Sequence, residues 1–247
     1  MDGQASWIPY CGAAPVPAEW LGRWNWDPLL IGCLAIGIFL WGRWTAAAKP
    51  LERQRLGLAA VLLALLFISP LCALTSALFS ARVTHHVLLT AAVAPLLMLS
   101  IPRASFPKTG SLTLWTFVQA AVFWAWHSPN LYSAALSNDA VYWLMQASLL
   151  ASAFGFWVAL RRSNEAAAIT GLLLSMVQMG LLGALITFAG TPLYAPHFSS
   201  TAAWSLSPLE DQQLAGLIMW IPSAGIYLGA ALALANRWLR ADFRPSS

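Results

Sequence analysis

Charged side chains are scarce in this sequence: Asp, Glu, Lys and Arg make up only 9% of its 247 residues, against about 25% in an ordinary soluble domain. Because 59% of the residues are apolar, such a chain cannot cover its own surface in water. The scarcity of charge excludes a soluble enzyme, a disordered tail, a coiled coil and a nucleic-acid-binding protein. The class that remains is a membrane protein that crosses the bilayer several times.

Several sequence patterns are also absent. Apolar and polar residues do not alternate over segments of about 10 residues, as they would in a transmembrane barrel. The first 27 residues have no basic start and no apolar segment, so they do not form a signal peptide. No Walker, GxSxG, HExxH or GxGxxG motif occurs, so nothing indicates a hydrolase or a nucleotide-dependent enzyme. We therefore predict an all-α membrane protein that is not an enzyme.

Long apolar runs without an internal Lys or Arg are what the sequence does contain. Each is close to the length of about 20 residues that a bilayer-spanning helix needs. Seven such runs cover approximately residues 28–44, 56–79, 84–101, 111–127, 140–160, 168–189 and 211–235. The sequence thus predicts a seven-transmembrane-helix bundle over residues 28–235, preceded by an irregular segment over 1–27 and followed by a basic tail over 236–247.

The basic residues predict the orientation of this bundle. Eleven of the 13 Lys and Arg residues fall on one side of the predicted topology: Arg43, Lys49, Arg53, Arg55, Arg103, Lys108, Arg161, Arg162, Arg237, Arg240 and Arg244. Because cytoplasmic loops are enriched in basic residues, we expect an extracytoplasmic N-terminus and a cytoplasmic C-terminus. The expected location is the bacterial cytoplasmic (inner) membrane, in contact with membrane lipids.

Residue types that suit copper or a haem iron gather on the predicted extracytoplasmic side. They are His85, His86, His127, His197, Cys11 and Met145. Adjacent residues of a helix point about 100° apart, so one metal ion would rarely bind both His85 and His86. We favour His86, because Arg82 four residues earlier shares its helix face. The candidate pair is His86 with His127, and the others are weaker candidates.

Plainer roles compete with these metal roles. His127 lies next to two Trp residues and suits an interfacial hydrogen bond equally well. For His197, in a loop that contains Pro, we expect a solvated position. Cys11 is a metal ligand, a mixed-disulfide partner or simply a small residue. The spacing of the three cysteines indicates no disulfide framework, so Cys33 and Cys72 are expected to be buried packing residues.

Polar residues near the last apolar run have local explanations. Ser207 followed by Glu210 fits a capping box, which accounts for Glu210. Asp211 fits the same capping role, and a contact with a metal relay or a partner protein is the alternative. Gln146 lies inside an apolar run, where we expect it to bridge helices by hydrogen bonds.

Four segments together resemble one family, the seven-helix CtaG-type (caa3-type) cytochrome c oxidase assembly factors. They are SPLCALTSALFSARVTHHVLLTAAVAPLLML, WHSPNLYSAAL, LLGALITFAGTPLY and SPLEDQQLAGLIMWIPSAGIYL, in family order over most of the chain. The resemblance implies a role in respiratory chain biogenesis, in which the protein contacts a subunit of a haem–copper oxidase around the insertion of its copper.

Two positions depart from the family pattern. Arg82 and Gln146 stand where the family has histidines, so half of the intramembrane histidine set is missing. His86 and His127 could still form a two-helix metal site. Arg82 is then expected to pair with Asp211, with an anionic lipid or with a haem propionate.

Two other functions stay open at this point. One is a membrane haem or redox protein with His86 and His127 as axial ligands. The other, less favoured, is a metal or solute transporter, because the sequence has no charged residue at mid-depth and no internal repeat. The bound group is accordingly copper, haem or none.

Overall fold

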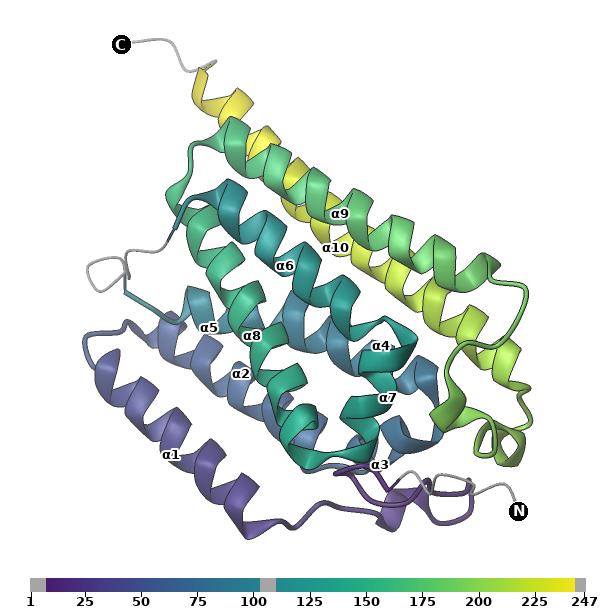
Figure 1. Ribbon diagram of the computed structural model, residues 1–247. Helices are drawn as coiled ribbons and strands as arrows, with labels where there is room; N and C mark the ends of the chain where they lie inside the picture. The colour runs from purple at the N-terminus through teal and green to yellow at the C-terminus, as the bar shows by residue number, and fades with distance from the viewer. Residues whose placement is uncertain (1–7, 103–109, 243–247) are drawn as a thin grey trace.

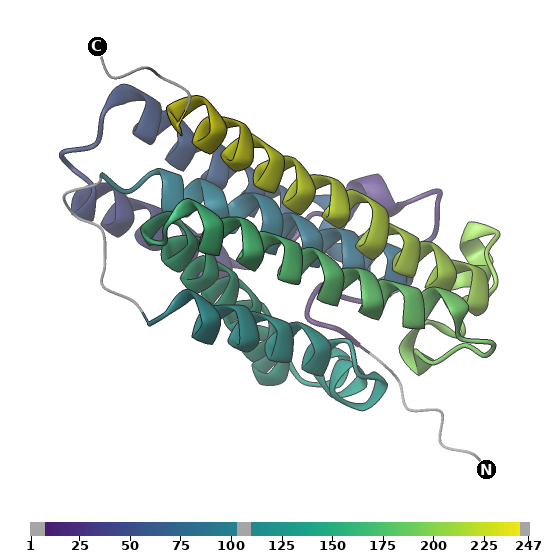
Figure 2. The same cartoon turned by 90° about the horizontal axis from the view of Figure 1, so that it is seen from above.

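The protein is a bundle of helices, described by a computed structural model over residues 8–102 and 110–242 (Figures 1 and 2). Within those residues no strand occurs, which confirms the all-α prediction. The α-helices are α1 (Pro28–Trp44), α2 (Pro50–Phe67), α3 (Pro70–Ala77), α4 (Phe79–Leu88), α5 (Ala94–Leu99), α6 (Leu112–Trp126), α7 (Pro129–Ser137), α8 (Asp139–Arg162), α9 (Glu165–Phe188) and α10 (Pro208–Asp242). Shorter turns are η1 (Trp20–Gly22), η2 (Leu89–Val93), η4 (Ala195–His197) and η5 (Thr201–Trp204).

Four helices of the described chain are long and apolar enough to cross a membrane: Phe79–Leu99, Asp139–Arg162, Glu165–Phe188 and Pro208–Arg240. A fifth is obtained if α2 and α3, which are bent by 47°, count as one span. The helices α1 and α6 are apolar but have only 17 and 15 residues. All seven predicted runs are therefore largely helical, whereas the number of seven crossings stays a prediction.

Proline and serine explain where the predicted boundaries were wrong. The expected helix over 56–79 is broken at Ser69, whose hydroxyl accepts a hydrogen bond from the Leu71 N–H and so caps α3. Pro70 occupies the first turn of α3, where its missing N–H has no cost. The next helix begins at Phe79 rather than near residue 84. Helix α7 was not predicted, and α10 continues to Asp242 through part of the expected tail.

Some predictions fall on residues outside the described part of the chain. These are the first seven residues of the expected N-terminal segment, the last five of the expected tail, and the basic residues Arg103, Lys108 and Arg244. The described basic residues of the orientation argument lie near the connections α1–α2 and α8–α9 and near the end of α10. The N-terminal segment lies at the opposite end of the bundle (Figure 1).

The helix Phe79–Leu99 is the most buried of the four long apolar helices. It runs through α4, a π-helical turn over Leu89–Val93 and α5. The π turn precedes Pro95, which has no N–H to offer the preceding turn. The Trp157 indole N–H of α8 donates to the Thr90 carbonyl at 3.0 Å, so a neighbouring helix satisfies a backbone group at this irregularity.

Helices α9 and α10 lie side by side over much of their length (Figures 1 and 2). Their backbones approach closely at Gly183 and Gly216. A Cβ on Gly216 would lie 2.6 Å from the Gly183 carbonyl oxygen, which no side chain tolerates. Small residues of this kind are typical of helix contacts within membranes.

Candidate functional site: a buried histidine pair beside an arginine

The start of α4 is fixed by a carboxylate from another helix. Asp211 of α10 is fully buried and accepts hydrogen bonds from the backbone N–H groups of Phe79 at 2.7 Å and Ser80 at 3.2 Å. The Ser80 hydroxyl also donates to Asp211. The residue in the N-cap position, Leu78, supplies no capping side chain. Asp211 therefore caps α4, whereas the sequence analysis expected it to cap its own helix.

His86 of α4 and His127 at the end of α6 form the pair that the sequence favoured. The Nδ1 atom of His86 lies 3.4 Å from the Nε2 atom of His127. The two rings are nearly perpendicular, with an interplanar angle of 89°. Both side chains are buried, with exposed fractions of 0% and 2%. Residues separated by 41 positions in the sequence thus present two imidazole nitrogen atoms to each other.

The other nitrogen of His127 determines which tautomer faces His86. His127 Nδ1 lies 2.7 Å from the Phe123 carbonyl oxygen, which can only accept a hydrogen bond, so Nδ1 carries the proton. The lone pair of Nε2 therefore points toward His86. Without a metal, His86 donates its Nδ1–H to this lone pair. The Nε2 atom of His86 has no hydrogen-bond partner.

Arg82 lies one turn before His86 on α4 and is completely buried. None of its three guanidinium nitrogen atoms has a hydrogen-bond partner among the described residues. Its Cζ atom lies 5.2 Å from the centre of the Tyr142 ring, within cation–π distance. In the described part of the chain its guanidinium makes no ion pair. The expected pairing with Asp211 is therefore wrong, because Asp211 is occupied at the start of α4.

His197 of η4 is buried, with 2% of its surface exposed, so the expected solvated position is wrong. Its Nε2 atom lies 2.6 Å from the hydroxyl oxygen of Tyr132 on α7. Burial lowers the pKa of His197 to about 3, and the charge of Arg82 acts in the same direction. Burial raises the pKa of Tyr132, which the charge of Arg82 opposes. Both residues are therefore neutral at physiological pH.

The connection between α9 and α10 packs against His127 and the start of α4. Tyr194 in this connection donates its hydroxyl to the His127 carbonyl at 2.8 Å, and its ring stacks on Phe79 with centroids 3.6 Å apart. Gln212 holds the connection, because its Oε1 accepts from the Leu193 N–H at 2.7 Å. The sequence analysis did not identify Tyr194. Gln212 follows Asp211 at the start of the last apolar run, where the sequence suggested a contact with a metal relay or a partner protein and not this role in holding the connection.

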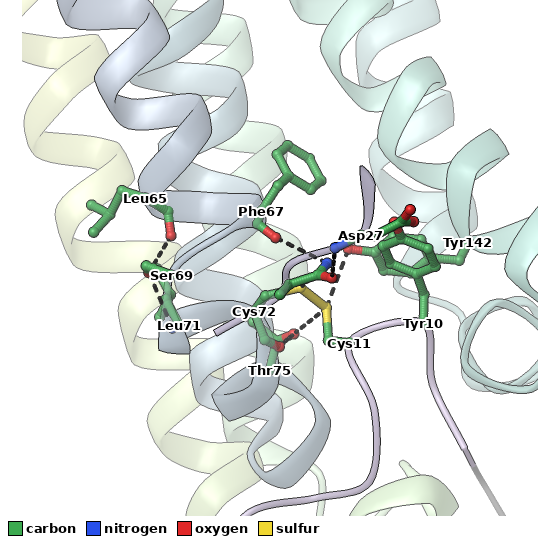
Figure 3. The surroundings of a disulfide bond; sticks show 11 residues. Tyr10, Cys11, Asp27, Leu65, Phe67, Ser69, Leu71, Cys72, Thr75 and Tyr142 are labelled. Carbon is green, nitrogen blue, oxygen red and sulfur yellow. Dashed lines mark hydrogen bonds between the residues drawn. A yellow bond between two sulfur atoms is a disulfide. The ribbon is translucent and has the colours of Figure 1, made fainter. Parts of the chain in front are cut away.

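A disulfide joins the N-terminal segment to the bundle. Cys11 and Cys72 of α3 are bonded, with their Cα atoms 5.4 Å apart (Figure 3). The prediction that the cysteines form no disulfide is wrong, because the fold brings together residues 61 positions apart. Cys11 is thus no free thiolate ligand. Cys33 of α1, expected to be buried, is a free and exposed cysteine.

Tyr10 and Tyr142 lie beside this disulfide (Figure 3). Their rings stack with centroids 5.2 Å apart, and the Tyr142 hydroxyl lies 3.6 Å from the Cys11 sulfur. The Tyr10 hydroxyl donates to the carboxylate of Asp27 at the start of α1, and this hydrogen bond lowers the pKa of Asp27. Burial raises the pKa of Tyr10. Tyr142 therefore connects the disulfide region to Arg82.

The remaining candidates lie on α8 or next to His86. Met145 and Gln146 are buried on α8, but within the described part of the chain neither amide atom of Gln146 has a hydrogen-bond partner, so the expected bridge to another helix is not found there. His85 packs edge-on against Phe67, with centroids 4.9 Å apart. Among the described residues no group of three or more His, Cys, Asp and Glu side chains could hold a metal ion. The histidine pair is therefore the strongest candidate for a metal site.

Comparison with known proteins gives a single finding. A family model described as cytochrome c oxidase caa3 assembly factor (Caa3_CtaG) matches residues 37–241. This range contains the histidine pair, Arg82, Asp211 and Cys72. No curated protein and no solved structure matches the chain.

Proposed function

The chain belongs to the Caa3_CtaG family of cytochrome c oxidase assembly factors, and from this we propose that it holds copper between His86 and His127 during assembly of a haem–copper oxidase. Copper is then the cargo of the protein and not a resident cofactor. The observation that carries the proposal is the 3.4 Å separation of the two facing imidazole nitrogen atoms.

This separation fits two bonds to one metal ion. Nitrogen ligands bind a metal such as zinc at about 2.0–2.1 Å, and two such bonds that meet at the metal with an angle of roughly 110° place the nitrogen atoms about 3.4 Å apart. Imidazole suits copper among the biological metals. The distance between the two nitrogen atoms therefore needs little change, and the rings must turn so that both lone pairs point at the ion.

The protonation state of the pair favours binding as well. His127 already presents the lone pair of Nε2, because its Nδ1–H is engaged by the Phe123 carbonyl. His86 must move its proton from Nδ1 to Nε2 when Nδ1 coordinates the ion. Its Nε2 has no hydrogen-bond partner among the described residues, so the change breaks only the hydrogen bond from His86 to His127, which the two bonds to the ion replace.

Two protein ligands suit a carrier better than a permanent site. A closed structural site normally has four ligands, whereas this pair leaves positions on the metal for a donor or an acceptor protein. Tyr194 and the connection around it must move to open access to His127, because Tyr194 is hydrogen-bonded to the His127 carbonyl. The acceptor that we propose is a copper-binding subunit of the oxidase.

We assign the end of the bundle that contains the disulfide and the histidine pair to the extracytoplasmic side. The disulfide between Cys11 and Cys72 lies at this end, and disulfides persist on the oxidising side of a membrane. The described basic residues of the loops lie at the other end (Figure 1). Together with α1 and α6 as short crossings, this orientation gives the seven-helix arrangement in the bacterial cytoplasmic membrane.

Axial haem ligation is less favoured by the same geometry. Two ligands on opposite faces of a haem would stand about 4 Å apart with bonds of about 2.0 Å, and the porphyrin ring would have to fit between them. The histidine nitrogen atoms are closer than this and both side chains are buried. We therefore do not propose a haem protein.

The experiment is a Cu(I) titration of the detergent-purified protein, under anaerobic conditions, against a chromophoric chelator. His86→Ala and His127→Ala should each weaken binding strongly, since a single imidazole remains. His85→Ala is the matched control, because His85 is equally buried on the same helix but lies outside the pair. The same variants are tested for oxidase activity in a strain that lacks the native protein.

Equal copper affinity in all three variants would overturn the copper site. If oxidase activity still depended on the protein in that case, the family role would stand and the copper proposal would fail. Normal oxidase activity in the deletion strain would contradict the role in assembly itself.

A further inference from the structure

Arg82 carries a charge that the described protein does not balance. The guanidinium is completely buried, and an arginine does not lose its proton in a protein. Among residues 8–102 and 110–242 no ion pair of Arg82 is found, whereas Arg23 pairs with Glu19 at the surface. A buried charge needs an opposite charge and hydrogen bonds to offset its loss of hydration. Something outside the described chain must supply both.

Other buried polar groups of the described chain, all of them neutral, also lack partners. Both ring nitrogen atoms of His85, both amide atoms of Gln146 and the Ser76 hydroxyl are buried without a hydrogen bond. These groups come from α3, α4 and α8. Buried polar groups without partners are rare in proteins, and an ordered water or ion commonly explains them. Water can satisfy the neutral groups but cannot balance the charge of Arg82.

The aromatic neighbours of Arg82 are also uncharged. Tyr142 presents its ring to the guanidinium, and the guanidinium lies close enough to the hydroxyls of Tyr132 and Tyr142 to act on both, but neither hydroxyl supplies a negative charge. Asp211 is held by Phe79 and Ser80 at the start of α4. No acidic side chain of the described chain forms an ion pair with Arg82.

We propose that Arg82 holds a small inorganic anion of the size of chloride inside the bundle. A monovalent anion supplies the missing charge and accepts hydrogen bonds from several N–H and O–H groups at once. Complete burial of the guanidinium favours a small ion over a lipid phosphate, whose attached chains would need an open path to the bilayer. The anion is proposed from Arg82 and does not require that copper binds at His86 and His127.

An anion at Arg82 has a consequence for its neighbour on the helix. Arg82 and His86 lie one turn apart on the same face of α4, so an unbalanced guanidinium repels any cation held at His86. A bound anion removes that repulsion. If copper binds as proposed, chloride should strengthen it.

The test uses the full-length purified protein, exchanged from chloride into gluconate at constant ionic strength. Chloride is added back, and binding is measured by broadening of the chloride NMR signal and by the thermal unfolding temperature. We expect the broadening of the chloride signal to saturate as for a single site and to be reduced by bromide. We also expect chloride to raise the unfolding temperature. Arg82→Gln should lose all three effects, and Arg23→Gln, which changes an exposed arginine, should keep them.

Three results would overturn the proposal. The first is a wild-type protein whose signal and unfolding temperature do not respond to chloride, a result that needs no variant to fold. The second is saturable binding that Arg82→Gln and Arg82→Lys both leave unchanged, because the site would then lie elsewhere. The third is an ultraviolet tyrosinate signal at neutral pH in gluconate, since the counter-charge would then belong to the chain.

Discussion

Replacing Asp211 with Ala should destabilise the protein through a helix that is distant in sequence. The variant removes one carboxylate from α10 and leaves the N–H groups of Phe79 and Ser80 without acceptors inside the bundle. It also removes the partner of the Ser80 hydroxyl. Helix α4 then begins without a cap, and His86 lies two turns further along this helix.

The magnitude follows from these hydrogen bonds. Loss of an N-cap side chain costs about 0.5–2 kcal/mol, and a buried hydrogen bond to a charged group contributes about 1.5–3 kcal/mol. Because the bonds share one carboxylate they are not additive, and we expect Asp211→Ala to cost about 3–4 kcal/mol in total. Asp211→Asn keeps one carbonyl acceptor and should cost roughly half of this.

The adjacent acid supplies a matched control. Glu210 is exposed and accepts a hydrogen bond from the Ser207 N–H in the capping box of its own helix. Glu210→Ala should change stability far less, because water replaces the lost partner. The assay is thermal and denaturant unfolding in one detergent, followed by tryptophan fluorescence. Equal losses for Asp211→Ala and Glu210→Ala would refute the assignment of Asp211 as the cap of α4.

Two further predictions concern the disulfide and His197. The double variant Cys11→Ser, Cys72→Ser removes a disulfide whose cysteines are separated by 61 positions. Loop-closure entropy gives an upper estimate of about 4 kcal/mol for the lost stability. Equal unfolding temperatures of the reduced and the oxidised protein would contradict this prediction. The pKa of His197 in the folded protein, about 3, lies below its unfolded value of about 6.5, so the unfolded chain binds the proton first as pH falls. The free energy of unfolding should therefore decrease as the pH falls from about 6.5 toward 3, by up to about 1.4 kcal/mol per pH unit. His197→Gln should make this dependence on pH less steep. The same dependence in the variant would exclude His197 as its cause.

The sequence predicted those parts of the fold that depend on composition and local pattern. Length and apolarity identified the helices, and Ser207 with Glu210 identified a cap that the structure confirms. The break at Ser69 was missed because the apolar run continues through Pro70, and apolarity alone does not reveal a bend. Helix α7 is short and follows directly on α6, so it was counted as a loop.

Of the candidate site, the sequence analysis identified only the two paired histidines. His86 and His127 were chosen from residue type and predicted side, and the structure brings them together. His197 was misjudged because a loop sequence does not show that Tyr132 covers it. The disulfide and the role of Asp211 depend on contacts between segments far apart in the chain, for which one sequence gives no signal.

The measurement closest to the central claim is the X-ray absorption spectrum of the protein loaded with Cu(I). The account predicts a first shell that contains two nitrogen scatterers at about 2.0 Å with the multiple-scattering pattern of imidazole, and its loss in the variant with both His86→Ala and His127→Ala. A first shell of sulfur alone, or the same spectrum in that variant, would contradict a copper site at the histidine pair.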